Sequence, residues 1–147
     1  MLKRYRFWLW LAVVFLFLTA LIHATSLFFE PAAQNETERQ LFDLMSSYKQ
    51  DFGAGFKRST KELVTALSAC FSFLCLLGGL TLAFLLRKQA EVRIMMGVVG
   101  IHALVFGICL AVMVVFTFLP PIILTGLIFL TLLLGYFLMP RQHETSS

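Results

Sequence analysis

Residues 94–139 read IMMGVVGIHALVFGICLAVMVVFTFLPPIILTGLIFLTLLLGYFLM, and this stretch decides the class of fold. It contains no Asp, Glu, Lys or Arg, and Pro120-Pro121 divides it into two apolar runs, 94–119 and 122–139. About 20 apolar residues in a helix cross the hydrocarbon core of a bilayer. Two consecutive prolines end one helix, and the second is suited to open the next. The stretch therefore predicts two membrane-spanning helices joined by a tight turn as an antiparallel hairpin.

Two further apolar runs precede this hairpin, at residues 7–29 and 63–86, and both lack charged side chains. In lipid, each backbone polar group must be hydrogen-bonded within its own segment, which favours a helix for each run. The hydrophobic content of 59% over 147 residues departs from that of soluble domains. We expect an all-α fold with one domain over residues 1–147: an integral membrane four-helix antiparallel bundle.

Basic residues flank the apolar runs and predict the orientation. Seven of them fall on one side, at Lys3, Arg4, Arg6, Arg87, Lys88, Arg93 and Arg141. The connection 30–62 on the other side carries five basic residues and six acidic ones. Short loops rich in Lys and Arg stay in the cytoplasm, so both termini are expected there. Trp8 and Trp10 stand at the depth of an aromatic belt, and the basic residues form no stripe with interleaved aromatics. The expected partner is the lipid bilayer, and nucleic acid is not expected.

The connection 30–62 is the only loop long enough to form structure. Asn35 is followed three residues later by Glu38, a capping-box pattern. Apolar residues then recur at helical spacing, at Leu41, Met45, Tyr48 and Phe52. This pattern predicts an amphipathic helix over about 36–52, ended by the glycines within 53–55. Such a helix is expected to lie on the membrane surface as a lid; the alternative is a docking surface or a gate over a pocket.

Small and hydroxyl side chains mark one face of two predicted spans. The second span carries Thr65, Ser68, Ser72, Cys75 and Gly79. The third carries Gly100, Ala103, Gly107 and Ala111. Small residues let helix backbones approach closely, and hydroxyls hydrogen-bond between helices. These faces predict helix packing, with a ligand-lining face as the alternative.

Two histidines, His23 and His102, lie within predicted spans, where an ionisable residue suggests function. Their estimated depths differ by roughly 12 Å, and no third ligand lies near, so no metal site is expected. For each, the alternative is a neutral imidazole bonded to a neighbouring helix. His23 stands near the outer surface, on the same side as Arg58 and Ser59, just before the second span.

The candidate site for a ligand or lipid therefore consists of His23, Arg58, Ser59 and Ser72. A guanidinium beside the positive end of a helix favours an anionic partner such as a lipid phosphate. A structural cap that holds the loop helix explains the same residues. No catalytic residue, metal ligand or cofactor is predicted.

Several short motifs resemble an uncharacterised family of small four-span bacterial membrane proteins. They are the sequence at 55–59, Gly-Phe-Lys-Arg-Ser, then Glu62-Leu63, Phe71-Ser72, His23 and the proline turn. That family usually has an aromatic residue soon after the acidic-leucine pair, where this chain has Val64-Thr65. The resemblance implies a multi-pass protein of the bacterial inner membrane and supplies no activity.

The sequence leaves three functions open. The first is an accessory or scaffolding subunit of a larger membrane complex, or of a homo-oligomer. The second is a binding protein for a lipid, quinone or other hydrophobic ligand in the outer half of the bundle. The third, least favoured, is an enzyme or small transporter. No Cys-x-x-Cys pair and no carboxylate within a span occur in the sequence. These features argue against a disulfide oxidoreductase and a proton-coupled exporter.

Overall fold

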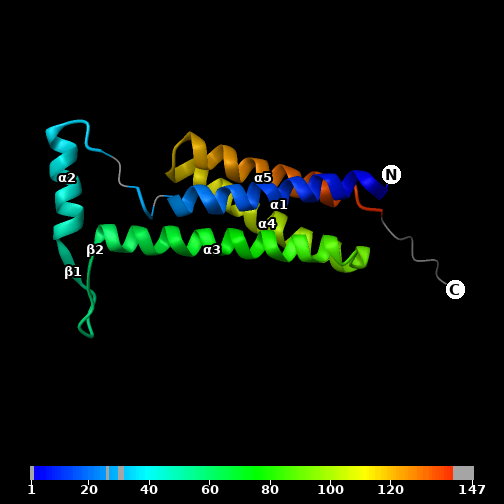
Figure 1. Ribbon diagram of the computed structural model, residues 1–147, viewed down its shortest axis with the longest axis horizontal. Coiled ribbons are helices and arrows are strands. Elements are labelled where there is room, and N and C mark those ends of the chain that lie inside the picture. Colours follow the sequence, from blue (N-terminus) through cyan, green and yellow to red (C-terminus); the bar gives the residue numbers. More distant parts are fainter. Residues whose placement is uncertain (1, 26, 30–31, 141–147) are drawn as a thin grey trace. The chain divides into compact units, whose positions relative to one another are not determined.

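The computed structural model describes residues 2–25, 27–29 and 32–140, so Glu30, Arg141 and His143 lie outside the described residues. Within this part the chain is mostly helical (Figure 1). The helices are α1 (Leu2–Thr25), α2 (Glu36–Ser47), α3 (Thr60–Arg87), α4 (Val92–Phe116) and α5 (Leu119–Phe137). A small antiparallel sheet pairs β1 (Lys49–Asp51) with β2 (Lys57–Ser59). The predicted all-α class is confirmed, and α1, α3, α4 and α5 are each long and apolar enough to cross a membrane.

The long helices begin earlier than the apolar runs predict. α1 starts at Leu2 and not at residue 7, because Lys and Arg are good helix formers and continue the helix beyond the apolar run. α5 starts at Leu119 and not at residue 122, with both prolines in its first turn. The first backbone N–H groups of a helix have no intrahelical acceptor, so prolines at this position remove no helical hydrogen bond.

The prediction of a loop helix over 36–52 is wrong for the second part of that range. α2 ends at Ser47, and residues 49–51 form β1. The hydroxyls of Ser46 and Ser47 donate to carbonyl oxygens of the preceding turn (2.7 Å each), a bonding mode that weakens helix continuation. Residues 53–55, predicted to end the helix, instead form the tip of a hairpin. Gly53 and Gly55 both have φ of 84°, a conformation that glycine adopts without steric cost.

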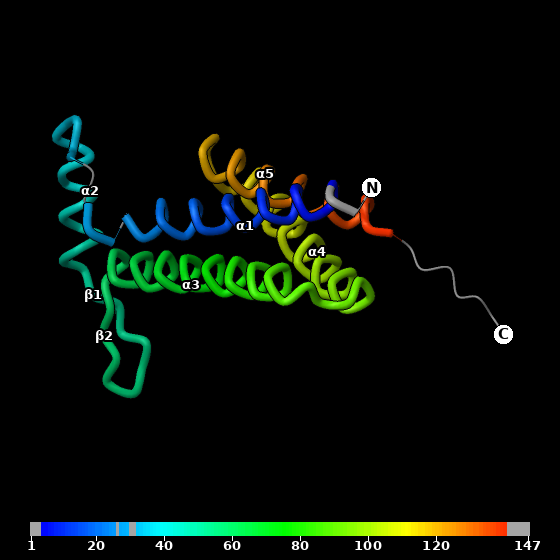
Figure 2. Tube along the Cα trace, turned by 45° about the vertical axis from the view of Figure 1, so that its right-hand side comes forward, coloured from blue at the N-terminus to red at the C-terminus, as the bar shows by residue number. Residues whose placement is uncertain are grey.

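The chain forms two compact units, residues 1–19 with 75–147, and residues 20–74. In the second unit, α2 contacts β2 and runs crosswise to the first half of α3 (Figure 2). None of the residues of α2 is buried. Leu41 and Leu44 are exposed, and Phe42 and Met45 are partly exposed.

In the first unit, close approaches at glycines join α1 to two other helices. A Cβ placed on Gly79 of α3 would lie 2.8 Å from the ring of Phe17 in α1. A Cβ placed on Gly135 of α5 would collide with the side chain of Leu9, also in α1. Large side chains that are almost fully buried in this unit include Leu9, Leu16, Leu82, Leu86, Val99, Ile128 and Leu132.

The small-residue face predicted on the third span packs on α5 over part of its length. A Cβ on Gly107 would lie 3.0 Å from the Phe129 ring, and one on Gly100 would lie 3.3 Å from the Tyr136 ring. Both aromatic residues belong to α5, so α4 and α5 form the antiparallel hairpin that the proline turn predicts. Ala111, by contrast, is exposed. The close packing therefore involves only the first part of the predicted face.

Candidate functional site

Ser59, one of the four predicted site residues, caps α3. Its hydroxyl accepts the backbone N–H of Glu62 (3.2 Å), and the Glu62 carboxylate accepts the backbone N–H of Ser59 (2.7 Å). This reciprocal pair is a capping box, and it satisfies backbone donors at the start of the helix. Ser59 is 2% exposed, so the hydroxyl has a structural partner within its own turn.

Arg58 lies in the exposed hairpin just before this cap. Its backbone pairs with that of Gln50, and its guanidinium donates to the carbonyl of Lys57 (3.1 Å). The guanidinium carbon also lies 6.0 Å from the centroid of the Phe56 ring, within the range of a cation–π contact. Pairing with β1 and contacts with the two preceding residues therefore position this arginine.

His23 and Ser72 lie on the two long helices that reach into the second unit. The His23 ring meets the Phe71 ring edge-on, with centroids 4.8 Å apart, which places the end of α1 against α3. Ser72 is 7% exposed, and its hydroxyl donates to the carbonyl of Ser68 one turn earlier (2.9 Å). The predicted approach of His23 to Arg58 and Ser59 stays a prediction, as does a ligand site lined by these residues.

Among the described residues, His102 is hydrogen-bonded within its own helix. Its Nδ1 lies 2.8 Å from the carbonyl oxygen of Val98, so an imidazole with its proton on Nδ1 donates to that carbonyl. Nε2 then faces Gly78 of α3, where an added Cβ would lie 3.5 Å away. His102 therefore acts as a packing residue between α4 and α3.

The cysteines differ in exposure: Cys75 is buried, Cys109 is partly exposed and Cys70 is exposed. Within the described part of the chain, no group of three or more His, Cys, Asp or Glu side chains is arranged to hold a metal ion.

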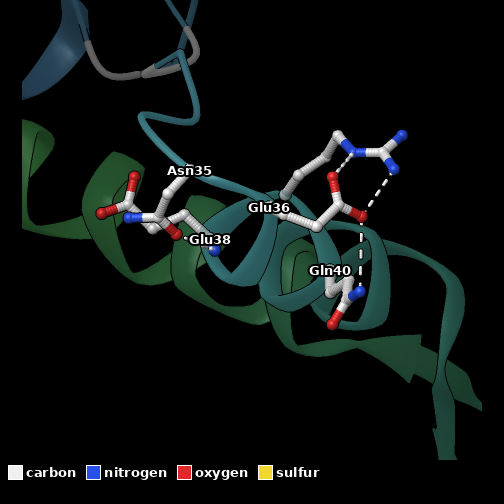
Figure 3. Close-up of polar contacts among 5 residues, drawn as sticks. Asn35, Glu36, Glu38 and Gln40 are labelled. Atoms are coloured by element: carbon white, nitrogen blue, oxygen red, sulfur yellow. Dashed lines mark hydrogen bonds and ion pairs between the residues drawn. The ribbon is translucent and has the colours of Figure 1, made fainter.

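The start of α2 carries a dense set of polar contacts (Figure 3). The Asn35 side chain accepts the backbone N–H of Glu38 (2.9 Å), as the capping-box pattern predicts. The Glu38 carboxylate, however, accepts the N–H of Gln34 (2.8 Å). Arg39 donates two hydrogen bonds to the carboxylate of Glu36, at 2.9 and 2.7 Å, and these bonds hold the pKa of Glu36 below its usual range. These contacts order the exposed loop without burying it.

One contact that sequence reasoning missed joins two chain segments far apart. The Arg6 guanidinium donates to the backbone carbonyl of Leu86 (2.6 Å), 80 residues away. This carbonyl lies in the last turn of α3, where backbone acceptors lack helical partners and a positive charge is favourable. The basic residues before the first apolar run are the signal in the sequence for this contact, but by themselves they predict only the orientation in the membrane.

Comparisons with known proteins returned no relative. No family model, no curated protein and no solved structure matches the chain.

Proposed function

We propose that the chain is an accessory subunit of a larger membrane complex, with α1, α3, α4 and α5 crossing the bacterial inner membrane as an antiparallel bundle. The apolar outer surface of the four helices supports membrane insertion. Lipid covers such a surface without a free-energy cost, whereas its exposure to water is unfavourable. The observation that carries the subunit role is the exposure of α4. Only 17% of its most apolar stretch is buried, against 28% in the other three helices.

Six of the exposed side chains of α4 form one continuous aliphatic face. They are Ile101, Leu104, Val105, Ile108, Val112 and Val115. Their spacing of three or four residues keeps them on one side of the helix. In this proposal, a helix of the partner protein packs against this face and replaces lipid there.

Site-specific photo-crosslinking in intact cells tests the proposal. A photoreactive residue in place of Leu104 on this face should give one discrete adduct with a larger membrane protein. The same residue in place of Leu77 in α3, which is also exposed (61%), should give none. An adduct of twice the 16.7 kDa chain mass at Leu104 would favour a homo-oligomer. Lipid adducts alone at both positions would contradict the subunit role and favour a binding protein for hydrophobic ligands.

The amphipathic helix α2 supports the placement of the bilayer. It runs crosswise to the first half of α3 and begins with acidic residues, including Glu36 and Glu38 (Figure 1). A helix of this kind lies in the plane of the membrane interface when its neighbour spans the membrane. In this proposal, α2 and the hairpin lie on the extracytoplasmic surface, and both termini lie in the cytoplasm.

Cysteine labelling tests this orientation. In a variant without the three native cysteines, Ser46→Cys in α2 should react with an impermeant thiol reagent added outside intact cells. Gln89→Cys, in the link between α3 and α4, should react only after the cells are permeabilised. Both positions are exposed, so a lack of reaction reports the side of the membrane and not burial. Labelling at residue 89 but not at residue 46 would reverse the topology.

A further inference from the structure

A surface pocket of about 460 Å³ opens in the first unit, between the start of α1 and the end of α5. Its lining consists of Arg4, Phe7, Trp8 and Leu138. The rings of Phe7 and Trp8 meet edge-on, with centroids 5.5 Å apart. The volume lies within the range of about 300–1,000 Å³ that small-ligand sites occupy. One end of this pocket is cationic, and the rest is aromatic and aliphatic.

The N–H groups of the Arg4 guanidinium are hydrogen-bond donors for a ligand in this pocket. Over residues 2–25, 27–29 and 32–140, the structure records no hydrogen bond or ion pair to Arg4, whereas the neighbouring Arg6 is bonded to Leu86. A guanidinium presents five N–H donors in a planar fork that matches the oxygens of a phosphate. The pocket therefore contains an exposed cation of the type that binds phosphate best.

The position of the pocket selects an amphipathic ligand. It lies where the charge-free run of α1 begins, at Phe7, and where α5 ends. On the proposed membrane location, this is the depth of the cytoplasmic headgroup layer, where tryptophan and arginine concentrate. A ligand here has its polar part beside Arg4 and its apolar part beside Leu138.

We propose that this pocket binds an anionic phospholipid of the cytoplasmic leaflet, with the phosphate on Arg4 and an acyl chain along Phe7 and Leu138. The Trp8 indole N–H supplies a further donor at the level of the headgroup. A competing role for Arg4 is purely structural: a cation near the C-terminal end of α5 is favourable without any ligand. The inference rests on the membrane location in the proposed function, but not on the protein partner.

Native mass spectrometry of the full-length chain in neutral detergent tests the site. With phosphatidylglycerol and phosphatidylcholine added in equal amounts, the unmodified protein should retain the anionic lipid preferentially. Arg4→Gln should lower the ratio of bound phosphatidylglycerol to phosphatidylcholine by about tenfold, since it removes a charge-assisted fork. Arg87→Gln is the matched control, because Arg87 is an exposed cation at the adjacent end of α3 and does not line the pocket. It should leave the ratio unchanged.

Arg4→Lys separates the ligand role from the structural one. Lysine keeps the charge near α5 and so keeps the stability, but it lacks the fork, so the lipid ratio should fall while the unfolding temperature stays constant. Equal losses for Arg4→Gln and Arg87→Gln would show diffuse charge attraction and overturn the pocket. No loss for Arg4→Gln would overturn it too. Displacement of phosphatidylglycerol by inorganic phosphate would assign the pocket to a soluble anion. Membrane fractionation and Leu104 crosslinking of the Arg4 variants distinguish failure of this site from failure of the proposed function.

Discussion

Gly135→Ala is expected to lower the unfolding temperature of the protein, and Gly97→Ala is expected to raise it. A methyl group at Gly135 would collide with the Cδ2 atom of Leu9 and lie 2.9 Å from its Cγ. Leu9 is fully buried at 0% exposure, so its side chain has no free space to move into. Overpacking of this kind costs about 1–3 kcal/mol. That cost exceeds the gain of about 0.5–1 kcal/mol when alanine replaces glycine in a helix.

Gly97 is the control because it lies in α4 with no atom near the position of an added Cβ. At this position only the gain in helix propensity applies, so the unfolding temperature is expected to rise. Thermal unfolding in mild detergent, followed by tryptophan fluorescence, measures both variants. Gly135→Leu should lower the unfolding temperature further than Gly135→Ala. Equal stabilisation by alanine at both positions would show that α5 does not approach α1 at this point.

Arg6→Gln is expected to destabilise the protein by about 1.5–3 kcal/mol, the usual contribution of a hydrogen bond from a charged group. The Arg6 guanidinium is partly buried and donates at 2.6 Å to the Leu86 carbonyl, which also accepts a long bond of 3.4 Å from the Gln89 N–H. Without the guanidinium, the last turn of α3 loses both a donor and a favourable positive charge. The measurement is the midpoint of thermal unfolding in the same detergent.

Arg93→Gln serves as the control for net charge, because Arg93 is an exposed residue in the first turn of α4. Its loss should change the midpoint less than the loss of Arg6 does, since exposed charges contribute about 0–1 kcal/mol. Arg6→Lys should recover part of the stability, because lysine retains a positively charged donor. If Arg6→Gln and Arg93→Gln have equal effects, the bond to Leu86 is not what stabilises this end of the helices.

Parts of the candidate site were accessible from sequence because their contacts are local. The capping residues Asn35 and Ser59 bond to backbone groups three residues ahead, so a four-residue pattern is enough to identify them. The contact between the rings of His23 and Phe71 was not accessible from sequence, because it depends on the packing of two helices. The end of α2 was misjudged because the periodicity of Leu41, Met45, Tyr48 and Phe52 fits a helix, although an amphipathic period alone does not exclude a strand pair at its end.

The amino-acid sequence by itself determined the four long apolar helices, the break between α4 and α5 and the helix caps. Hydropathy and backbone hydrogen bonding act within one segment, so their outcome is independent of what the segment later contacts. Tertiary structure alone decided three features: the pairing of β1 with β2, the bond from Arg6 to Leu86 and the pocket that α1 and α5 line together. The bond and the pocket depend on the approach of residues distant along the chain, and side-chain shape at the contact, as at Gly135 and Leu9, decides which approach is close enough.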